Sequence, residues 1–209
     1  MLALTPEAHV LRVVDEHDVV RGTGFVVGVS GEVLTCHHVV DGLDGVRLVS
    51  PAGVSVDIAL ERMVSVPERD LALLPASEML GIVLPVSVRG PRVGSHFVTA
   101  GYHRLSASIR SAFPVAGVIR GRAVVRYESA SAVYDLIDAL VLRHAEFDEG
   151  LSGAPVLDAE TGVVVGVVST KLSGIGRPAA SPSRCRRGRP SWRGCSPRTP
   201  TRFRRTGTS

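Results

Sequence analysis

Three short motifs hold residues that could do chemistry together. His38 lies in TCHHV (residues 35–39), Asp70 opens DLAL (70–73), and Ser152 lies in GLSGAP (150–155). A serine hydroxyl is a weak nucleophile at neutral pH, so it needs a base within hydrogen-bond reach and a third group that orients the base. Histidine and a buried aspartate suit those two roles. Together the three residue types could carry out acyl transfer.

Acyl transfer also needs donors for the negative charge that develops on the attacked oxygen. Glycines around Ser152 let backbone N–H groups approach that charge, and we expect Gly150 and Ser152 to donate them. Each motif alone has an ordinary structural interpretation, such as a turn serine or a strand-end acid. The neighbouring His37 is expected to face solvent or end a strand, and Cys36 to fill the core.

The order of the motifs argues against other nucleophilic folds. An α/β-hydrolase places its histidine after the nucleophile, whereas the last histidine here is His144. A subtilisin-like enzyme would need its acid before its base and alternating helices and strands. A cysteine peptidase would need cysteine at position 152.

The elements that must position these residues are short and rich in valine. Such runs, separated by Gly, Pro, Asp and Ser, predict an all-β sandwich or pair of barrels. Periodicity leaves residues 134–142 open between a helical turn and a strand. Residues 75–91 are expected to connect two halves of similar length. The expected strands are 10–14, 24–29, 33–35, 46–50, 54–59, 70–74, 96–102, 123–127 and 163–170.

The 209 residues are 44% hydrophobic and 21% charged, which is enough for one substantial core. Residues 177–209 differ, with ten Arg, no acid and no Val, Ile or Leu, which predicts disorder. The remaining body has a net charge near −6. A shifted reading frame of GC-rich DNA would produce such a tail; a solvated tail and a basic arm for nucleic acid or acidic lipid are the alternatives.

Three cysteines, Cys36, Cys185 and Cys195, are too few and too scattered for a disulfide framework. No Cys/His spacing suggests zinc, and we expect neither metal nor cofactor. The sequence has no signal-peptide pattern and no apolar run of membrane-spanning length. We therefore expect a soluble, cytoplasmic protein without membrane or specific nucleic-acid partners; its oligomeric state is open.

With these motifs the chain resembles trypsin-like (chymotrypsin-fold) serine peptidases, particularly the bacterial HtrA/Deg-like domains. The resemblance covers roughly residues 8–176 and implies two six-stranded antiparallel β-barrels within a domain of residues 1–176. The first barrel would span about 8–80 and carry His38 and Asp70. The second would span about 92–176, carry Ser152, and be incomplete at its C-terminus if the last strand is lost to the tail.

The resemblance implies a serine endopeptidase acting on polypeptides. Ser152 would be the nucleophile, His38 the base, and Asp70 the orienting acid. Glu146 would lie near the floor of the substrate pocket and favour Lys or Arg, while Val168, Ser169 and Thr170 would pair with an extended peptide. Leu151 and Ala154 depart from the residues many relatives have. The alternatives are a non-catalytic peptide-binding or sensor module of a signalling or defence protein, and an esterase.

Overall fold

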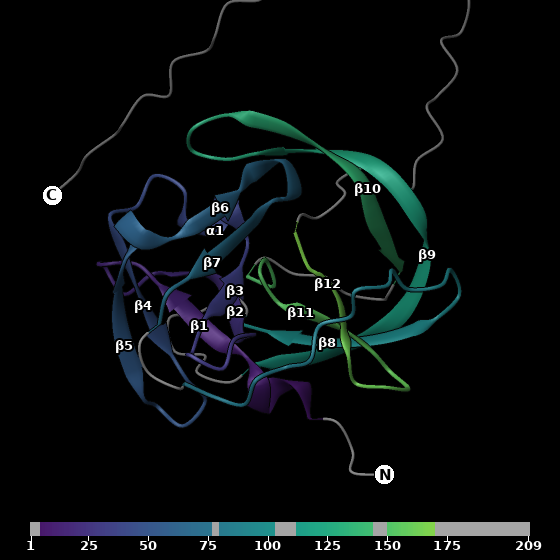
Figure 1. Cartoon of the computed structure of the whole chain (residues 1–209), viewed down its shortest axis with the longest axis horizontal. Coiled ribbons are helices and arrows are strands. Elements are labelled where there is room, and N and C mark those ends of the chain that lie inside the picture. The colour runs from purple at the N-terminus through teal and green to yellow at the C-terminus, as the bar shows by residue number, and fades with distance from the viewer. Residues whose placement is uncertain (1–4, 77–79, 103–111, 144–149, 170–209) are drawn as a thin grey trace, which may run out of the picture. The chain divides into compact units, whose positions relative to one another are not determined.

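The computed structural model describes residues 5–76, 80–102, 112–143 and 150–169. The chain divides into two units, Met1–Ser173 and Gly174–Ser209, and every described residue belongs to the first. That unit consists mostly of antiparallel strands, with one short helix and three 3-10 turns among the described residues (Figure 1). No helix in this part of the chain is both long and apolar enough to cross a membrane.

The first sheet has seven strands in the order β5-β4-β1-β2-β3-β7-β6. Its edge strands β5 and β6 are joined by only one 3-10 turn, η2, so the two edges must lie close and the sheet curls. The strands are β1 (Leu11–Val14), β2 (Val20–Val26), β3 (Val33–Thr35), β4 (Gly45–Val49), β5 (Ser55–Ala59), β6 (Val64–Val66) and β7 (Leu71–Leu74). The helix and turns are η1 (Pro6–His9), α1 (His37–Val40), η2 (Leu60–Arg62) and η3 (Pro67–Arg69).

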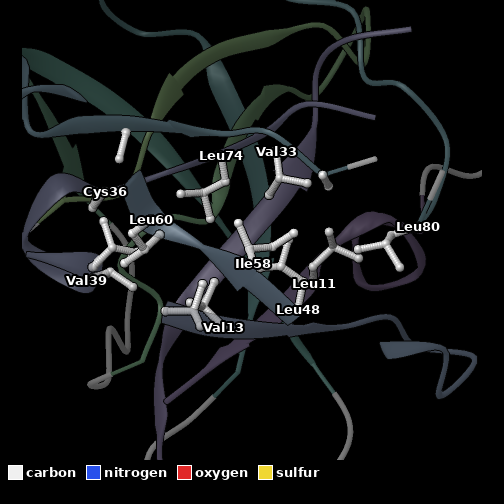
Figure 2. Close-up of a cluster of buried hydrophobic side chains, with 14 of the residues drawn as sticks. Leu11, Val13, Val33, Cys36, Val39, Leu48, Ile58, Leu60, Leu74 and Leu80 are labelled. Carbon is white, nitrogen blue, oxygen red and sulfur yellow. The ribbon is translucent and has the colours of Figure 1, made fainter. Parts of the chain in front are cut away.

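Alternating side chains build the core inside this sheet. In β4, Val46 and Leu48 are buried while Arg47 between them is only partly covered, as expected for a strand with one face inward. Figure 2 shows aliphatic side chains from several strands converging on one cluster. Cys36 and Val39 belong to this cluster, so the segment that carries His38 is anchored by its apolar neighbours.

The second sheet has five strands in the order β10-β9-β8-β11-β12. They are β8 (His96–Gly101), β9 (Phe113–Glu128), β10 (Val133–Arg143), β11 (Pro155–Asp158) and β12 (Val164–Val167). Phe97, Ile119 and Val156 form its buried core. A bulge at Asp138, whose φ is 67°, shifts the register of the long β9–β10 hairpin and bends it. In Figure 1 this hairpin arches over α1 and β6.

The predicted all-β, two-barrel fold is confirmed, with seven and five strands in the described residues where the resemblance implied six and six. Residues 134–142 lie in β10, because Tyr134 to Leu142 pair with β9 across the hairpin. The connecting segment is attached to both sheets: Leu84 N–H donates to the Val26 carbonyl (2.9 Å), and Val86 bridges to Val164. The proposed boundaries at 80, 92 and 176 remain predictions.

Candidate active site

His38 and Asp70 form a paired acid and base in the first sheet. The Nδ1 of His38 lies 2.8 Å from Oδ2 of Asp70, and the His38 backbone N–H donates to Oδ1 at 3.0 Å. Asp70 is fully buried, whereas the His38 side chain is 23% exposed. With the carboxylate as acceptor, Nδ1 of the neutral ring carries the proton, which leaves the Nε2 lone pair free to accept one.

Asp70 occupies a backbone conformation that few residue types adopt easily. It caps η3 with φ 52° and ψ 45°, in the left-handed region that aspartate tolerates better than most side chains. Burial raises the pKa of Asp70, but hydrogen bonds and charge from His38, with a further bond from Ser169, outweigh burial and hold the pKa below its ordinary value. The carboxylate is therefore ionised at neutral pH and able to orient the imidazole.

Ser169 is a site residue whose main contact the sequence did not reveal. Its hydroxyl donates to Oδ2 of Asp70, the oxygen that also faces His38. The predicted role of Ser169 involved its backbone only. A serine that follows a strand carries no distinguishing signal, and the two residues are separated by 99 positions.

The turn that carries Ser152 also contains the buried Leu151 and is built on two glycines in left-handed conformations. Gly150 has φ 105° and Gly153 has φ 90°, values that strain any other residue. The Ser152 hydroxyl donates to the Ser169 carbonyl at 2.8 Å, and no hydrogen bond joins it to His38 in the described structure. Among the described residues, the N–H groups of Gly150 and Ser152 have no hydrogen-bond acceptor.

Of the four predicted substrate-binding residues, the structure describes Val168 and Ser169. Glu146 and Thr170 lie outside the described residues. Val168 uses both backbone groups within the chain: its N–H donates to the Ala154 carbonyl and its carbonyl accepts from Gly153, each at 2.8 Å. In Ser169, the next residue of the predicted peptide-pairing strand, the backbone carbonyl accepts from the Ser152 hydroxyl.

Cys36, His38 and Asp70 place ligand atoms within 4.8 Å of one another, a donor set that zinc accepts. These atoms already have partners, because Cys36 Sγ donates to the Val168 carbonyl at 3.1 Å and His38 is bonded to Asp70. Burial, with the nearby Asp70 charge, raises the pKa of the Cys36 thiol well above its ordinary value. We therefore interpret the cluster as a hydrogen-bonded acid–base pair beside a protonated core thiol.

The expectation that His37 faces solvent or ends a strand was wrong. His37 is the first residue of α1 and its side chain is buried. Its Nδ1 lies 2.8 Å from the Ser65 hydroxyl, and its Nε2 lies 3.8 Å from an Asp41 oxygen. Tyr134 covers it edge-on, with ring centroids 6.0 Å apart. The covering side chain comes from the distant β9–β10 hairpin, which is why the local sequence gave no sign of it.

The same hairpin also contacts the base and the turn that precedes the acid. The Tyr127 ring lies 6.0 Å from the His38 ring and stacks on Tyr134 at 5.3 Å, while its hydroxyl donates to the Pro67 carbonyl in η3. At the tip, Ser131 N–H donates to an Asp41 oxygen at 2.7 Å. The hairpin thus contacts both the turn that precedes Asp70 and the helix that carries His38.

Replacing Tyr127 with phenylalanine removes the hydroxyl that holds η3 and leaves the ring in place. We expect the free energy of unfolding to fall by about 1 kcal/mol, because the partly buried Pro67 carbonyl loses one of its two donors and keeps only the Asp70 N–H. Tyr134→Phe is the matched control, since the Tyr134 hydroxyl has no hydrogen bond among the described residues. Urea unfolding of both variants measures the difference; equal losses would contradict the role given to Tyr127.

Two curled antiparallel sheets, one holding an acid–base pair and the other a Gly-Leu-Ser-Gly turn, define the chymotrypsin-like class of fold. The profile of the trypsin-like peptidase domain matches residues 22–167, and the chain belongs to that family.

Solved structures share this fold at low identity. The active form of the Rv3671c protease from M. tuberculosis is 22% identical, with a TM-score of 0.61 over 78% of this chain and 70% of that one. The MamO protease domain from Magnetospirillum magneticum is 19% identical, with a TM-score of 0.64 over 84% and 91%. The serine endoprotease from Yersinia pestis is 18% identical, with a TM-score of 0.58 over 78% and 54%.

A curated relative is much longer. Uncharacterized protein y4bJ of Sinorhizobium fredii is 27% identical over 157 residues, which is 74% of this chain and 22% of the relative. The chain thus spans about a fifth of that protein's length.

Proposed function

We propose that this chain is a serine endopeptidase that hydrolyses peptide bonds through His38, Asp70 and Ser152. The observation that carries the proposal is the buried, ionised Asp70 bonded to His38 Nδ1, which leaves Nε2 able to accept a proton. Ser169 links this pair to the nucleophile, because its hydroxyl binds Asp70 while its carbonyl accepts from Ser152.

In the proposed reaction, Ser152 Oγ attacks the scissile carbonyl carbon and its proton passes to His38 Nε2. The N–H groups of Gly150 and Ser152 stabilise the resulting oxyanion. The C–N bond then breaks, His38 returns the proton to the leaving amine, and an acyl ester remains on Ser152. Water then attacks the ester carbonyl while His38 takes one of its protons, and His38 passes that proton to Ser152 Oγ as the ester C–O bond breaks and the acid is released. Asp70 stabilises the imidazolium at both steps.

The described conformation requires one movement before attack. The Ser152 hydroxyl donates to the Ser169 carbonyl, so it must turn about its Cα–Cβ bond to donate to His38. An extended polypeptide that offers its own N–H to the Ser169 carbonyl would compete for that acceptor and favour the turned hydroxyl. Glu146 remains a proposed determinant of Lys or Arg preference, and a cytoplasmic location remains a prediction.

A peptide-binding or sensor module without turnover is the second candidate. The bond between the Ser152 hydroxyl and the Ser169 carbonyl favours it, because a hydroxyl held there is not activated by the base. The match covers only 22% of the curated relative's length, which is consistent with a module in a larger protein. An esterase would use the same residues, and comparing activated-ester with peptide turnover separates it from a peptidase.

A fluorophosphonate probe tests the proposal directly. An activated Ser152 displaces fluoride from phosphorus and gains a stable adduct, which mass spectrometry of the intact chain and its peptides locates. We expect one adduct on Ser152 and none in Ser152→Ala. A folded parent protein that takes no label would contradict the peptidase proposal and support the binding module.

A further inference from the structure

Thr23 joins the first sheet to the Ser152 turn through hydrogen bonds. It belongs to β2 and is fully buried. Its N–H donates to the Ser152 carbonyl at 2.8 Å, and its hydroxyl donates to the Gly150 carbonyl at 2.9 Å. The same hydroxyl accepts from Tyr102 N–H at 3.1 Å, and the Thr23 carbonyl accepts from the Thr35 hydroxyl at 2.7 Å. The Thr23 hydroxyl therefore acts as both a donor and an acceptor.

These bonds fix the direction of two peptide groups in the turn. A peptide unit is planar, so the anchored Gly150 carbonyl also fixes the Leu151 N–H, and the anchored Ser152 carbonyl also fixes the Gly153 N–H. The Ser152 N–H belongs to the Leu151–Ser152 peptide unit, which lies between these two anchored units and is therefore restricted in its rotation. The N–H groups of Gly150 and Ser152 themselves have no acceptor among the described residues.

The backbones of β2 and of the Ser152 turn approach each other closely. A Cβ on Gly153 would lie 1.9 Å from the Thr23 carbonyl oxygen, and one on Gly22 would lie 2.7 Å from the Ser152 carbonyl oxygen. A Cβ on Gly101 would lie 2.8 Å from the Thr23 hydroxyl. Glycines at these three positions allow the strand and the turn to approach closely enough for direct hydrogen bonds.

We propose that Thr23 is a positioning residue, whose hydroxyl holds the Gly150 carbonyl and so helps to orient the oxyanion-binding N–H of Ser152. This inference rests on the proposed peptidase function. Thr23 itself does not touch the substrate. Because the oxyanion forms only during reaction, loss of this positioning lowers kcat with little change in KM.

The chain supplies a matched control. Thr99 is also fully buried, yet within the described residues its hydroxyl has no hydrogen-bond partner. Thr99→Val and Thr23→Val both replace a buried hydroxyl with a methyl group. Thr23→Ser keeps the hydroxyl of Thr23 and removes only its methyl group.

Turnover of p-nitrophenyl acetate measures kcat and KM for the parent and the three variants at a temperature where urea curves show each one folded. We expect Thr23→Val to lower kcat by about 10-fold or more, below the roughly 10²–10³-fold cost of removing an oxyanion donor itself. KM should change little, Thr23→Ser should recover most of the rate, and Thr99→Val should match the parent. An unchanged kcat in Thr23→Val, or an equal loss in Thr99→Val, would overturn the inference.

Hydrogen exchange separates this inference from the proposed function. We expect the hydrogen-bonded amides of Gly153 and Ala154 to exchange faster in Thr23→Val than in the parent or in Thr99→Val, whether or not the protein has activity. A parent without turnover or fluorophosphonate label, combined with faster exchange in Thr23→Val, would refute the peptidase but keep the positioning role. Unchanged exchange in Thr23→Val would refute the positioning role.

Discussion

His38→Ala is expected to lower kcat for peptide cleavage by at least about 10⁴-fold, because Ser152 then has no base to take its proton. The adjacent His37→Ala is expected to keep kcat within a few fold of the parent. His37 is bonded to Ser65 and covered by Tyr134, so its loss acts on stability and costs about 1–3 kcal/mol. A quenched fluorescent unfolded protein reports the cleavage rate, and urea unfolding reports stability.

The two neighbouring histidines make this comparison unusually well matched. They share one short helix, so a general distortion of α1 would affect both variants alike. A separation of effects, with activity lost at His38 and stability lost at His37, is what the contacts predict. Equal loss of activity at both positions, with both variants folded, would contradict the assignment of His38 as the base.

The sequence predicted the parts of the site that local motifs encode. The strand runs in β4 and β7 alternate between buried and partly covered residues, which is the pattern a one-sided sheet imposes. The Gly-rich turn was predictable because only glycine readily adopts the φ values found at Gly150 and Gly153. The pairing of His38 with Asp70 required knowledge of the family motifs as well as the residue types.

Contacts between segments far apart in the chain could not be predicted in the same way. Ser169 reaches Asp70 across 99 positions, and Thr23 reaches Gly150 across 127. Such pairs depend on strand order and on how the sheets curl, and no local pattern of hydrophobicity encodes either. The contact between Tyr134 and His37 was unpredictable for the same reason, since Tyr134 reaches His37 only because the bulged hairpin bends back over α1.

Asp70→Asn is expected to lower kcat by about 10⁴-fold while leaving the fold intact, because the amide has the size and shape of the carboxylate it replaces. An asparagine NH₂ that faces Nδ1 donates where the carboxylate accepted. The ring then carries its proton on Nε2 and cannot take one from Ser152. Asp158→Asn is the control: Asp158 ends β11, accepts from Thr161 N–H at 2.9 Å and has no place in the proposed mechanism.

The free energy of unfolding should depend on pH because Asp70 is ionised in the folded protein. The pKa of Asp70 is lower in the folded protein than its ordinary value of about 3.9, so ionised Asp70 stabilises the fold fully above that pH. This contribution is lost as the pH falls through the folded pKa. The unfolding free energies of the parent and Asp70→Asn should therefore differ most at pH 7 and converge toward pH 3 in urea titrations. A difference independent of pH would mean that folding does not shift the pKa of Asp70, and a difference that changes with pH in the opposite direction would mean that the native carboxyl is protonated. Either result would contradict the proposed role of Asp70 in orienting His38.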